Sequence, residues 1–411
     1  MDSEVTSEAQ REDGEYAVRI AASVGAFTRD EWNGFSGTTR TPGKPYNPFI
    51  SYDFLTILEE SGCAVRRTGW QGHHLRLEDA SGRLLGAVPC YAKSHSQGEY
   101  VFDHGWADAF ERAGGSYYPK LQCSVPFTPA TGPRLLVNET SDPSQIKAAL
   151  GGALKTVTDR VGVSSAHVTF LDDSDADALE GAGFLRRIDQ QFHFFNEGYG
   201  SYDDFLATLA SRKRKALKKE RREALAKGIS IDRLTGSDLT EAVWDDFYAF
   251  YMDTGGRKWG RPYLNRKFFS LIGERMRDDV LLVMAKRKGH YIAGAINFIG
   301  SDTLYGRNWG CIEDHPFLHF EVCYHQAMDF AIERKLKVVE AGAQGEHKLA
   351  RGYRPVTTQS AHWIAHPGLR KAVSDYLARE RREVAHMADV LEDHGPFRKG
   401  ERTDAGRPVD D

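Results

Sequence analysis

The sequence contains little cysteine, and its cysteines form no recognisable framework. Among 411 residues there are five cysteines, an odd number, and no two of them form a C-x-x-C pair. This pattern favours reduced thiols over disulfides and argues against a structural zinc site. No apolar run reaches the roughly 18 residues of a membrane span, and residues 1–15 are acidic and polar. We therefore expect a cytoplasmic protein with no integral membrane segment.

A strong charge of one sign is missing as well. The formal net charge is −4 and the pI is near 6.4. This balance excludes a protein that binds polyanions over its whole surface, so any contact with nucleic acid must be local. Hydrophobic residues make up 41% of the chain, which is ordinary for a globular protein. The length exceeds the size at which one hydrophobic core stops growing, and this favours two domains.

Two units with the same order of elements are predicted. Each begins with helices, continues with an antiparallel meander, and ends with a long helix and a returning strand. This order predicts an α+β fold with mixed, mostly antiparallel sheets flanked by helices, and a cleft between the units. Two glycines within residues 196–200 mark the boundary. The expected parts are a disordered tail at 1–15, domains at 16–196 and 197–395, and a flexible tail at 396–411.

Four segments look like sequence motifs, namely residues 91–100, 127–133, 306–325 and 339–353. Together they resemble the FemAB-like peptidoglycan biosynthesis/recognition family of the GNAT (N-acetyltransferase) superfamily, over roughly residues 18–395. The resemblance implies two tandem GNAT-like domains, the first often degenerate as an acyl-donor site. It also implies a transferase whose chemistry lies in or beside the second domain.

Residues 340–353 hold the best candidates for acyl-transfer chemistry. Acylation of an amine needs a base for the nucleophile, donors for the developing oxyanion and a proton for the leaving group. Glu340, Glu346 or His347 is the candidate general base, and spacing does not choose among them. Tyr353 is a candidate acid, although an interior tyrosine with a satisfied hydroxyl is the more common outcome.

The same loop carries candidate binding residues. Lys348 and Arg351 are three positions apart, so a helical turn puts them on one face, where they can hold a phosphate or carboxylate. Lys348 is also similar to the loop lysine of the family. Gln344 and Glu346 complete the predicted donor- and substrate-binding set. The ordinary alternative is a solvated, charged turn.

The identity of the donor stays open. Coenzyme A usually places its pyrophosphate on a glycine-rich turn at a helix N-terminus. Residues 307–312 contain only one of the expected glycines, and Glu313 and Asp314 put negative charge nearby. Both an acyl-CoA such as acetyl-CoA and an aminoacyl-tRNA therefore remain candidate donors. The pocket is predicted to be lined by Arg307, Trp309 and His319.

No metal site is predicted. Four potential ligands fall at helical spacing, but neither H-E-x-x-H nor any zinc-ligand pattern is present. These residues are His315, His319, Glu321 and His325.

The first domain offers no convincing catalytic triad. Ser94 and His95 are consecutive, and neighbours on an extended chain point to opposite faces. We expect Asp103 and Tyr118, together with His104 and Trp106, to line the cleft shared with the second domain.

A basic run at residues 211–225 stands out in an otherwise acidic protein. It is the best candidate for contact with tRNA, anionic lipid or a nucleotide-linked precursor. No aromatic residue is interleaved for base stacking, so a solvated face and a remnant of the helical arm of Fem transferases are the alternatives. The predicted polyanion-binding residues are Arg212, Lys213, Arg214 and Lys215.

Three hypotheses follow. The leading one is an acyl- or aminoacyl-transferase in which a small-molecule or peptide amine attacks the donor directly. The second is a non-catalytic module that recognises a cell-wall or peptide ligand in the cleft. The third is a tRNA-dependent transferase, which predicts salt-sensitive binding of tRNA to the basic run.

Overall fold

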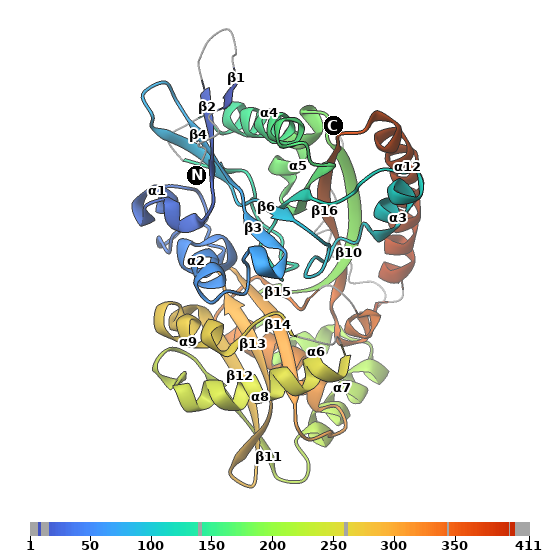
Figure 1. Cartoon of the computed structure of the whole chain (residues 1–411). Coiled ribbons are helices and arrows are strands. Elements are labelled where there is room, and N and C mark those ends of the chain that lie inside the picture. The colour runs from blue at the N-terminus through green and yellow to red at the C-terminus, as the bar shows by residue number, and fades with distance from the viewer. Residues whose placement is uncertain are drawn as a thin grey trace.

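The computed structural model describes residues 7–9, 16–138, 142–258, 262–342, 345–393 and 395–398. Within these ranges the strands form a five-stranded and an eleven-stranded sheet (Figure 1). The small sheet has the order β1 (Ser7–Ala9), β2 (Tyr16–Ala21), β4 (His74–Glu78), β5 (Leu84–Val88) and β8 (Leu136–Val137). The large sheet runs through β11 (Ile229–Leu234), β12 (Val280–Arg287), β13 (His290–Ile299), β14 (Thr303–Cys311), β15 (Val338–Glu340), β10 (Leu185–Phe195), β16 (Arg354–Ile364), β9 (Ser165–Leu171), β7 (Lys120–Cys123), β6 (Tyr91–Lys93) and β3 (Trp70–Gly72).

Each half of the chain repeats one arrangement of strands. In the first half β6 and β7 are antiparallel, and β9 joins β7 in parallel. In the second half β13 and β14 are antiparallel, and β15 joins β14 in parallel. A parallel neighbour requires a crossover, which α4 (Pro143–Val161) provides in the first half and the long helix before β15 provides in the second. The mixed, mostly antiparallel α+β fold predicted from the sequence is confirmed.

The last strand of the chain lies in the half of the sheet that the N-terminal residues build. β16 pairs with β10 on one side and with β9 on the other, both antiparallel. Helix α12 (Pro367–Asp393) follows and packs beside β10 and β16 (Figure 1). The division of the chain at residue 196 stays a prediction, but the structure adds that residues 354–364 are woven between strands of the first half.

Helices cover both faces of the second half of the sheet. Side chains on β13 alternate, so Ile296 and Phe298 join one core while Ala293 and Ala295 join the other. The first core is covered by α2 (Tyr52–Glu60), α8 (Glu241–Lys258) and α9 (Arg266–Arg275). The second is covered by α6 (Tyr202–Thr208), α7 (Ser211–Ala224) and α11 (Gln326–Glu333). The remaining longer helices are α1 (Arg29–Asn33), α3 (His104–Arg112) and α5 (Asp173–Gly181).

The long helix expected in the second unit is interrupted. It consists of α10 (Leu318–Phe320), the π-helical turn η6 (Glu321–His325) and α11. Such single π turns are frequent at functional sites. Here the turn directs Glu321 and His325 to helix α7, where they bond to Arg221 and Glu220. None of the helices in the described ranges combines the length and apolarity that a membrane crossing demands.

Candidate active site

The candidate site lies where strands β14 and β15 separate, near the middle of the large sheet. Their parallel pairing covers only Thr303–Tyr305 against Val338–Glu340. β15 ends there, while β14 continues to Cys311. Among the described residues, no strand pairs with β14 on this side beyond Tyr305. The loop with the predicted catalytic residues begins at this gap.

Glu340 is a buried carboxyl at the end of β15. In register it lies opposite Tyr305 on one side and His193 on the other, so the three side chains share a face. Glu340 is 8% exposed, and within the described residues its Oε2 atom has no hydrogen-bond partner. Burial raises its pKa to about 8, although Thr131 N–H, Arg307 and Arg134 favour the charged form. A carboxyl group poised near neutrality is a strong functional candidate.

The motif at residues 127–133 forms the opposite wall. Arg307 donates to the carbonyl oxygen of Phe127, a residue with φ of 60°. The Asn47 side chain donates to Thr131 O over 3.1 Å, and this bond anchors the loop of residues 127–133. The first-half motif and the second-half strands therefore meet at Glu340.

A β-bulge in β14 separates the residues that were predicted to line one pocket. On β13 Ala295 lies opposite Trp309, whereas Asn297 lies opposite Gly306, so β14 contains one extra residue between these pairs. The extra residue puts Arg307 on the face of Glu340 and Trp309 on the other face. Trp309 and His319 do come together, with ring centroids 5.1 Å apart. Arg307 instead lies 6.0 Å from the ring of Phe49.

Two of the predicted catalytic residues lie with Trp309 on that other face. His347 is exposed and its Nε2 atom is 2.9 Å from the hydroxyl of Tyr324. Burial, followed by the charge of Arg351, lowers the pKa of His347. Tyr353 is part of the core on this face, and burial raises its pKa well above the ordinary value. The structure therefore separates Glu340 from His347 and Tyr353.

Lys348 lies inside the loop rather than on its surface. It is 1% exposed, and its Nζ atom donates to Gly342 O over 2.9 Å. Burial lowers the pKa of Lys348 to about 8. Burial and, second, the charge of Lys348 lower the pKa of His193 to about 3, so Lys348 acts on the face of Glu340 as well. Gln344 and the side chain of Glu346 lie outside the described residues.

Arg351 is held by the basic helix. Its Nε and Nη2 atoms bind the two carboxylate oxygens of Glu220 over 2.9 and 2.7 Å, and Nη1 donates to His347 O over 2.7 Å. Glu220 also forms a 2.8 Å hydrogen bond with His325 Nε2. The guanidinium therefore links α7 to the loop. Sequence reasoning missed Glu220, although an acid within a basic run was a visible signal.

The basic residues of α7 divide into two groups. Arg221 points inward and binds Glu321 and Asp329 over 2.9 and 2.7 Å. Leu217 and Ala224 complete this inner face. The predicted polyanion-binding residues lie on the outer side, where Arg212, Lys213 and Lys215 are exposed and Arg214 is half-buried.

Asp103 and Tyr118, predicted to line the cleft, lie in a separate buried cluster of the first half. Lys120 Nζ is 2.5 Å from Asp103 and 2.7 Å from Glu99. Tyr118 shares a 2.8 Å bond with Ser96, which in turn donates to Asp103. This cluster adjoins β7, which β9, β16 and β10 separate from β15. The structure therefore does not bring Asp103 and Tyr118 to Glu340.

In the part of the chain that the structure describes, no group of three or more His, Cys, Asp or Glu side chains is arranged to hold a metal ion. The two outer histidines of the helical-spacing set bind carboxylates, His315 at Glu313 and His325 at Glu220. None of the five cysteines is joined in a disulfide.

The repeated sheet and the gap between β14 and β15 define a tandem GNAT-like fold. The structure of FemX has the same fold, with a TM-score of 0.51, 12% identity, and coverage of 85% of this chain and 98% of that one. L-PGS from Bacillus licheniformis matches with a TM-score of 0.46, 9% identity and coverage of 82% and 99%. A tandem GNAT protein from the clavulanic acid pathway gives 0.43, 12%, 86% and 99%.

Residues 23–399 match the FemAB-like family, described as peptidoglycan biosynthesis/recognition, and the chain belongs to that family. The comparison with curated proteins gives no match. Family and fold together make this chain an acyl- or aminoacyl-transferase of GNAT-like architecture.

Proposed function

We propose that the protein transfers an aminoacyl group from an aminoacyl-tRNA to an amine of a peptidoglycan precursor, with Glu340 as general base. The buried, incompletely bonded carboxyl of Glu340 carries this proposal. It faces Arg307 and the motif loop at the point where the sheet is open. Acyl-CoA is the alternative donor.

The chemistry needs one proton carrier. The neutral amine attacks the ester carbonyl and a C–N bond forms. Glu340 takes the proton from the attacking nitrogen, and the C–O bond to the tRNA ribose then breaks. Glu340 returns the proton to the departing ribose oxygen, so the carboxylate is regenerated. Arg307, on the same face, stabilises the oxyanion of the tetrahedral intermediate.

The raised pKa of Glu340 suits this role. A base is most effective when its pKa lies near the working pH, because it is then both ionised and basic. With a pKa of about 8, Glu340 gains its carboxylate form as the pH rises from 7 to 9. Lys348 supports the site as a positioning residue, since its bond to Gly342 O fixes the loop that follows Glu340.

The basic helix favours a tRNA donor over coenzyme A. The outer side of α7 presents exposed basic side chains. Its inner side is bonded to the loop after Glu340 through the ion pair of Glu220 and Arg351. A polyanion bound to α7 would therefore lie beside the loop. The sequence between β14 and α10, with Glu313 and Asp314, lacks the glycine-rich anion site of coenzyme A.

Thermal unfolding with candidate donors tests this assignment. A ligand that binds only the native state raises the melting temperature. We expect a shift with charged tRNA that weakens steeply with salt and is lost when Arg212, Lys213 and Lys215 are replaced by Gln. The matched control makes the same replacement at three exposed basic residues of α12, namely Lys371, Arg379 and Arg382. A shift with acetyl-CoA alone would overturn the donor assignment, and donor binding without product in any amine screen would favour the recognition module.

A further inference from the structure

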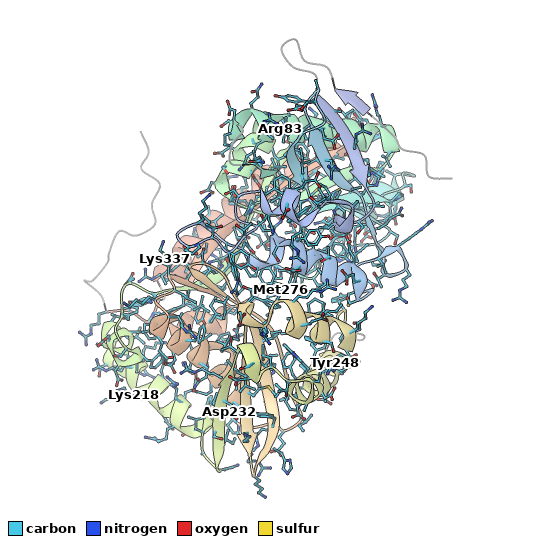
Figure 2. All side chains as sticks on the ribbon, turned by 90° about the vertical axis from the view of Figure 1, so that its left-hand side faces the viewer. Arg83, Lys218, Asp232, Tyr248, Met276 and Lys337 are labelled. Carbon is cyan, nitrogen blue, oxygen red and sulfur yellow. The ribbon has the colours of Figure 1, made fainter. Side chains whose placement is uncertain are left out.

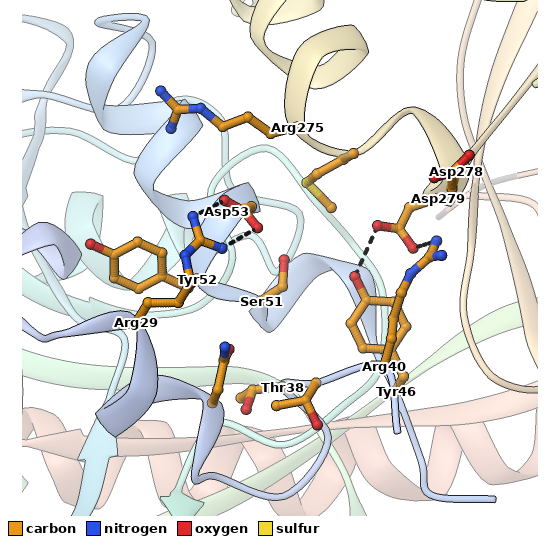
Figure 3. Close-up of a pocket in the computed structure, with 13 residues that line it drawn as sticks. Arg29, Thr38, Arg40, Tyr46, Ser51, Tyr52, Asp53, Arg275, Asp278 and Asp279 are labelled. Carbon is orange, nitrogen blue, oxygen red and sulfur yellow. Dashed lines mark hydrogen bonds and ion pairs between the residues drawn. The ribbon is translucent and has the colours of Figure 1, made fainter. Parts of the chain in front are cut away.

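A second cavity lies where the two halves meet, apart from the gap between β14 and β15. Its volume is about 250 Å³ (Figure 3). One wall comes from residues 29–53 of the first half and the other from residues 275–279 of the second. Met276, which lines it, lies at the junction of the halves in Figure 2. None of the site residues expected from the sequence lies in this cavity.

The walls consist largely of arginine–aspartate pairs. Arg29 Nη1 and Nη2 bind both oxygens of Asp53, over 2.6 and 2.7 Å. Arg40 forms an ion pair with Asp279, whose Oδ2 atom also accepts a 3.1 Å bond from the hydroxyl of Tyr46. Figure 3 draws these bonds on opposite sides of the cavity. The pairs hold the charged groups in place without a ligand.

The charges of the lining cancel. Each of its three arginines is paired with a carboxylate, Arg29 with Asp53, Arg40 with Asp279, and Arg275 with Glu60 just outside the lining. A guanidinium has five N–H donors and a carboxylate about four acceptor sites, so each pair keeps bonding capacity after it has formed. A ligand with a net charge would unbalance these pairs. An uncharged ligand whose hydroxyls both donate and accept would use the remaining donors and acceptors.

The size of the cavity limits the ligand. Pockets for drug-sized molecules occupy roughly 300–1,000 Å³, so about 250 Å³ suits a group of a single ring. The wall residue Tyr46 is followed by Asn47, whose side chain bonds to Thr131 O. The backbone of Thr131 in turn bonds to Glu340. A short chain of contacts thus joins this cavity to the candidate base.

We propose that this cavity binds one uncharged sugar ring of a glycan-containing acceptor. The assignment of that sugar to the acceptor rests on the proposed function, whereas the binding itself does not. Donors and acceptors of the Arg29–Asp53 and Arg40–Asp279 pairs, together with Asp278, bind the ring hydroxyls. The Arg40–Asp279 pair also ties the halves together, so the bound ring contacts both.

Ligand-observed NMR on the full chain tests the site without any transfer reaction. The probe is N-acetylglucosamine, compared with glucose 6-phosphate as a charged sugar and Ala-Ala as a zwitterion. We expect saturation transfer to N-acetylglucosamine above both others. Loss of one hydrogen-bonding group is worth about a fivefold change, so Arg29→Gln and Asp278→Asn should each weaken binding by about fivefold or more. The control Arg277→Gln changes an exposed neighbour outside the lining.

The outcomes separate this inference from the proposed function. Binding that is weakened by Arg29→Gln and Asp278→Asn, but not by Arg277→Gln, supports the sugar site even if no transfer activity is found. A stronger response to glucose 6-phosphate or Ala-Ala contradicts it. So does the absence of any response to N-acetylglucosamine, or a response that both lining variants leave unchanged, whatever the transfer assays give.

Discussion

Two buried carboxylates, one in each half, differ in how they are bonded. Asp103 is 3% exposed and has three close partners, Lys120 at 2.5 Å, Tyr117 at 2.7 Å and Ser96 at 2.8 Å. Although burial opposes ionisation, these partners hold the pKa of Asp103 below its usual range. Glu340 is similarly buried, forms no ion pair with any cation in the described ranges, and has a pKa of about 8.

The difference separates structural from functional burial. A buried charge with a cation and hydrogen bonds is compensated, and its removal disturbs packing and charge balance. A buried carboxyl with an unpaired oxygen costs stability, and such groups persist where they serve a reaction. Glu99 of the first-half cluster also has an unpaired oxygen, but Lys120 binds its other oxygen over 2.7 Å. We therefore regard that cluster as a structural element of the first half and propose Glu340 as the reactive group.

The largest effect should come from Glu340→Gln in the transfer reaction. A positioned general base contributes about 10²–10⁴-fold in rate, and the amide cannot accept the proton. With the donor and acceptor identified, kcat/KM of the wild type should rise with pH up to about 8 and then level off. The variant should lose both the rate and this pH dependence. A variant that keeps its rate would remove Glu340 from the mechanism.

Lys120→Met should destabilise the protein strongly. The substitution leaves Asp103 and Glu99 buried without their common cation, which costs about 3–5 kcal/mol in comparable pairs. Chemical denaturation measures this loss. The control is Lys218→Met, which removes an exposed ion pair with Asp203 and should change stability by less than about 1 kcal/mol. Equal effects of the two substitutions would mean that the cluster is not a stabilising unit.

Glu340→Gln should stabilise the protein, whereas Lys120→Met destabilises it. The folded protein holds the proton of Glu340 up to a pKa of about 8, whereas the unfolded chain releases it near 4.5. Wild-type stability is therefore lost as the pH rises from 4.5 to 8, and the variant escapes this loss. Relative to the wild type, the variant should gain on the order of 4 kcal/mol between pH 4 and pH 8. A pH-independent difference in the free energy of unfolding would show that Glu340 is ionised in the folded state.

Local sequence patterns were sufficient for most elements of the fold. The hairpin of β4 and β5, the meander of β12, β13 and β14, and helices α4 and α12 follow from periodicity and turn residues. The place of β16 does not, because pairing between segments some 170 residues apart leaves no trace in either segment alone. All three strands were predicted, but the position of β16 between β9 and β10 was not.

The site was harder to predict than the fold for three physical reasons. Strict alternation puts Arg307 and Trp309 on one face, and only the bulge on β14 separates them. Lys348 was predicted to hold a phosphate or carboxylate beside Arg351, and because burial of a lysine is rare, its position inside the loop was not foreseen. The long-range pair of Glu220 and Arg351 depends on how α7 docks. Glu340 was one of three candidate bases, and nothing in the sequence favoured it over His347.

A pair of buried histidines lies beside the Asp103–Lys120 cluster and extends the comparison of buried titratable groups. His167 and His362 lie opposite each other on β9 and β16, and their Nδ1 atoms are 2.7 Å apart. Burial lowers the pKa of His167 to about 3 and that of His362 well below its ordinary value. The groups around them, Asp103, Lys120, Arg187 and Tyr117, include two cations that disfavour a further positive charge.

The smallest effect we expect is therefore an acid sensitivity of this pair. Below pH 6.5 the histidines bind protons in the unfolded chain but stay neutral in the folded protein. The free energy of unfolding therefore falls as the pH drops from 6.5 towards 3. At pH 5 the loss is about 2 kcal/mol for His167. His362→Gln keeps a hydrogen-bonding side chain and should reduce the loss between pH 7 and pH 5, as measured by denaturant unfolding, while the exposed His290→Gln should not. If both variants follow the wild-type pH dependence, β16 is not held by a neutral histidine pair, and the carboxylate of Asp103 must outweigh the nearby cations and keep one of the two rings charged.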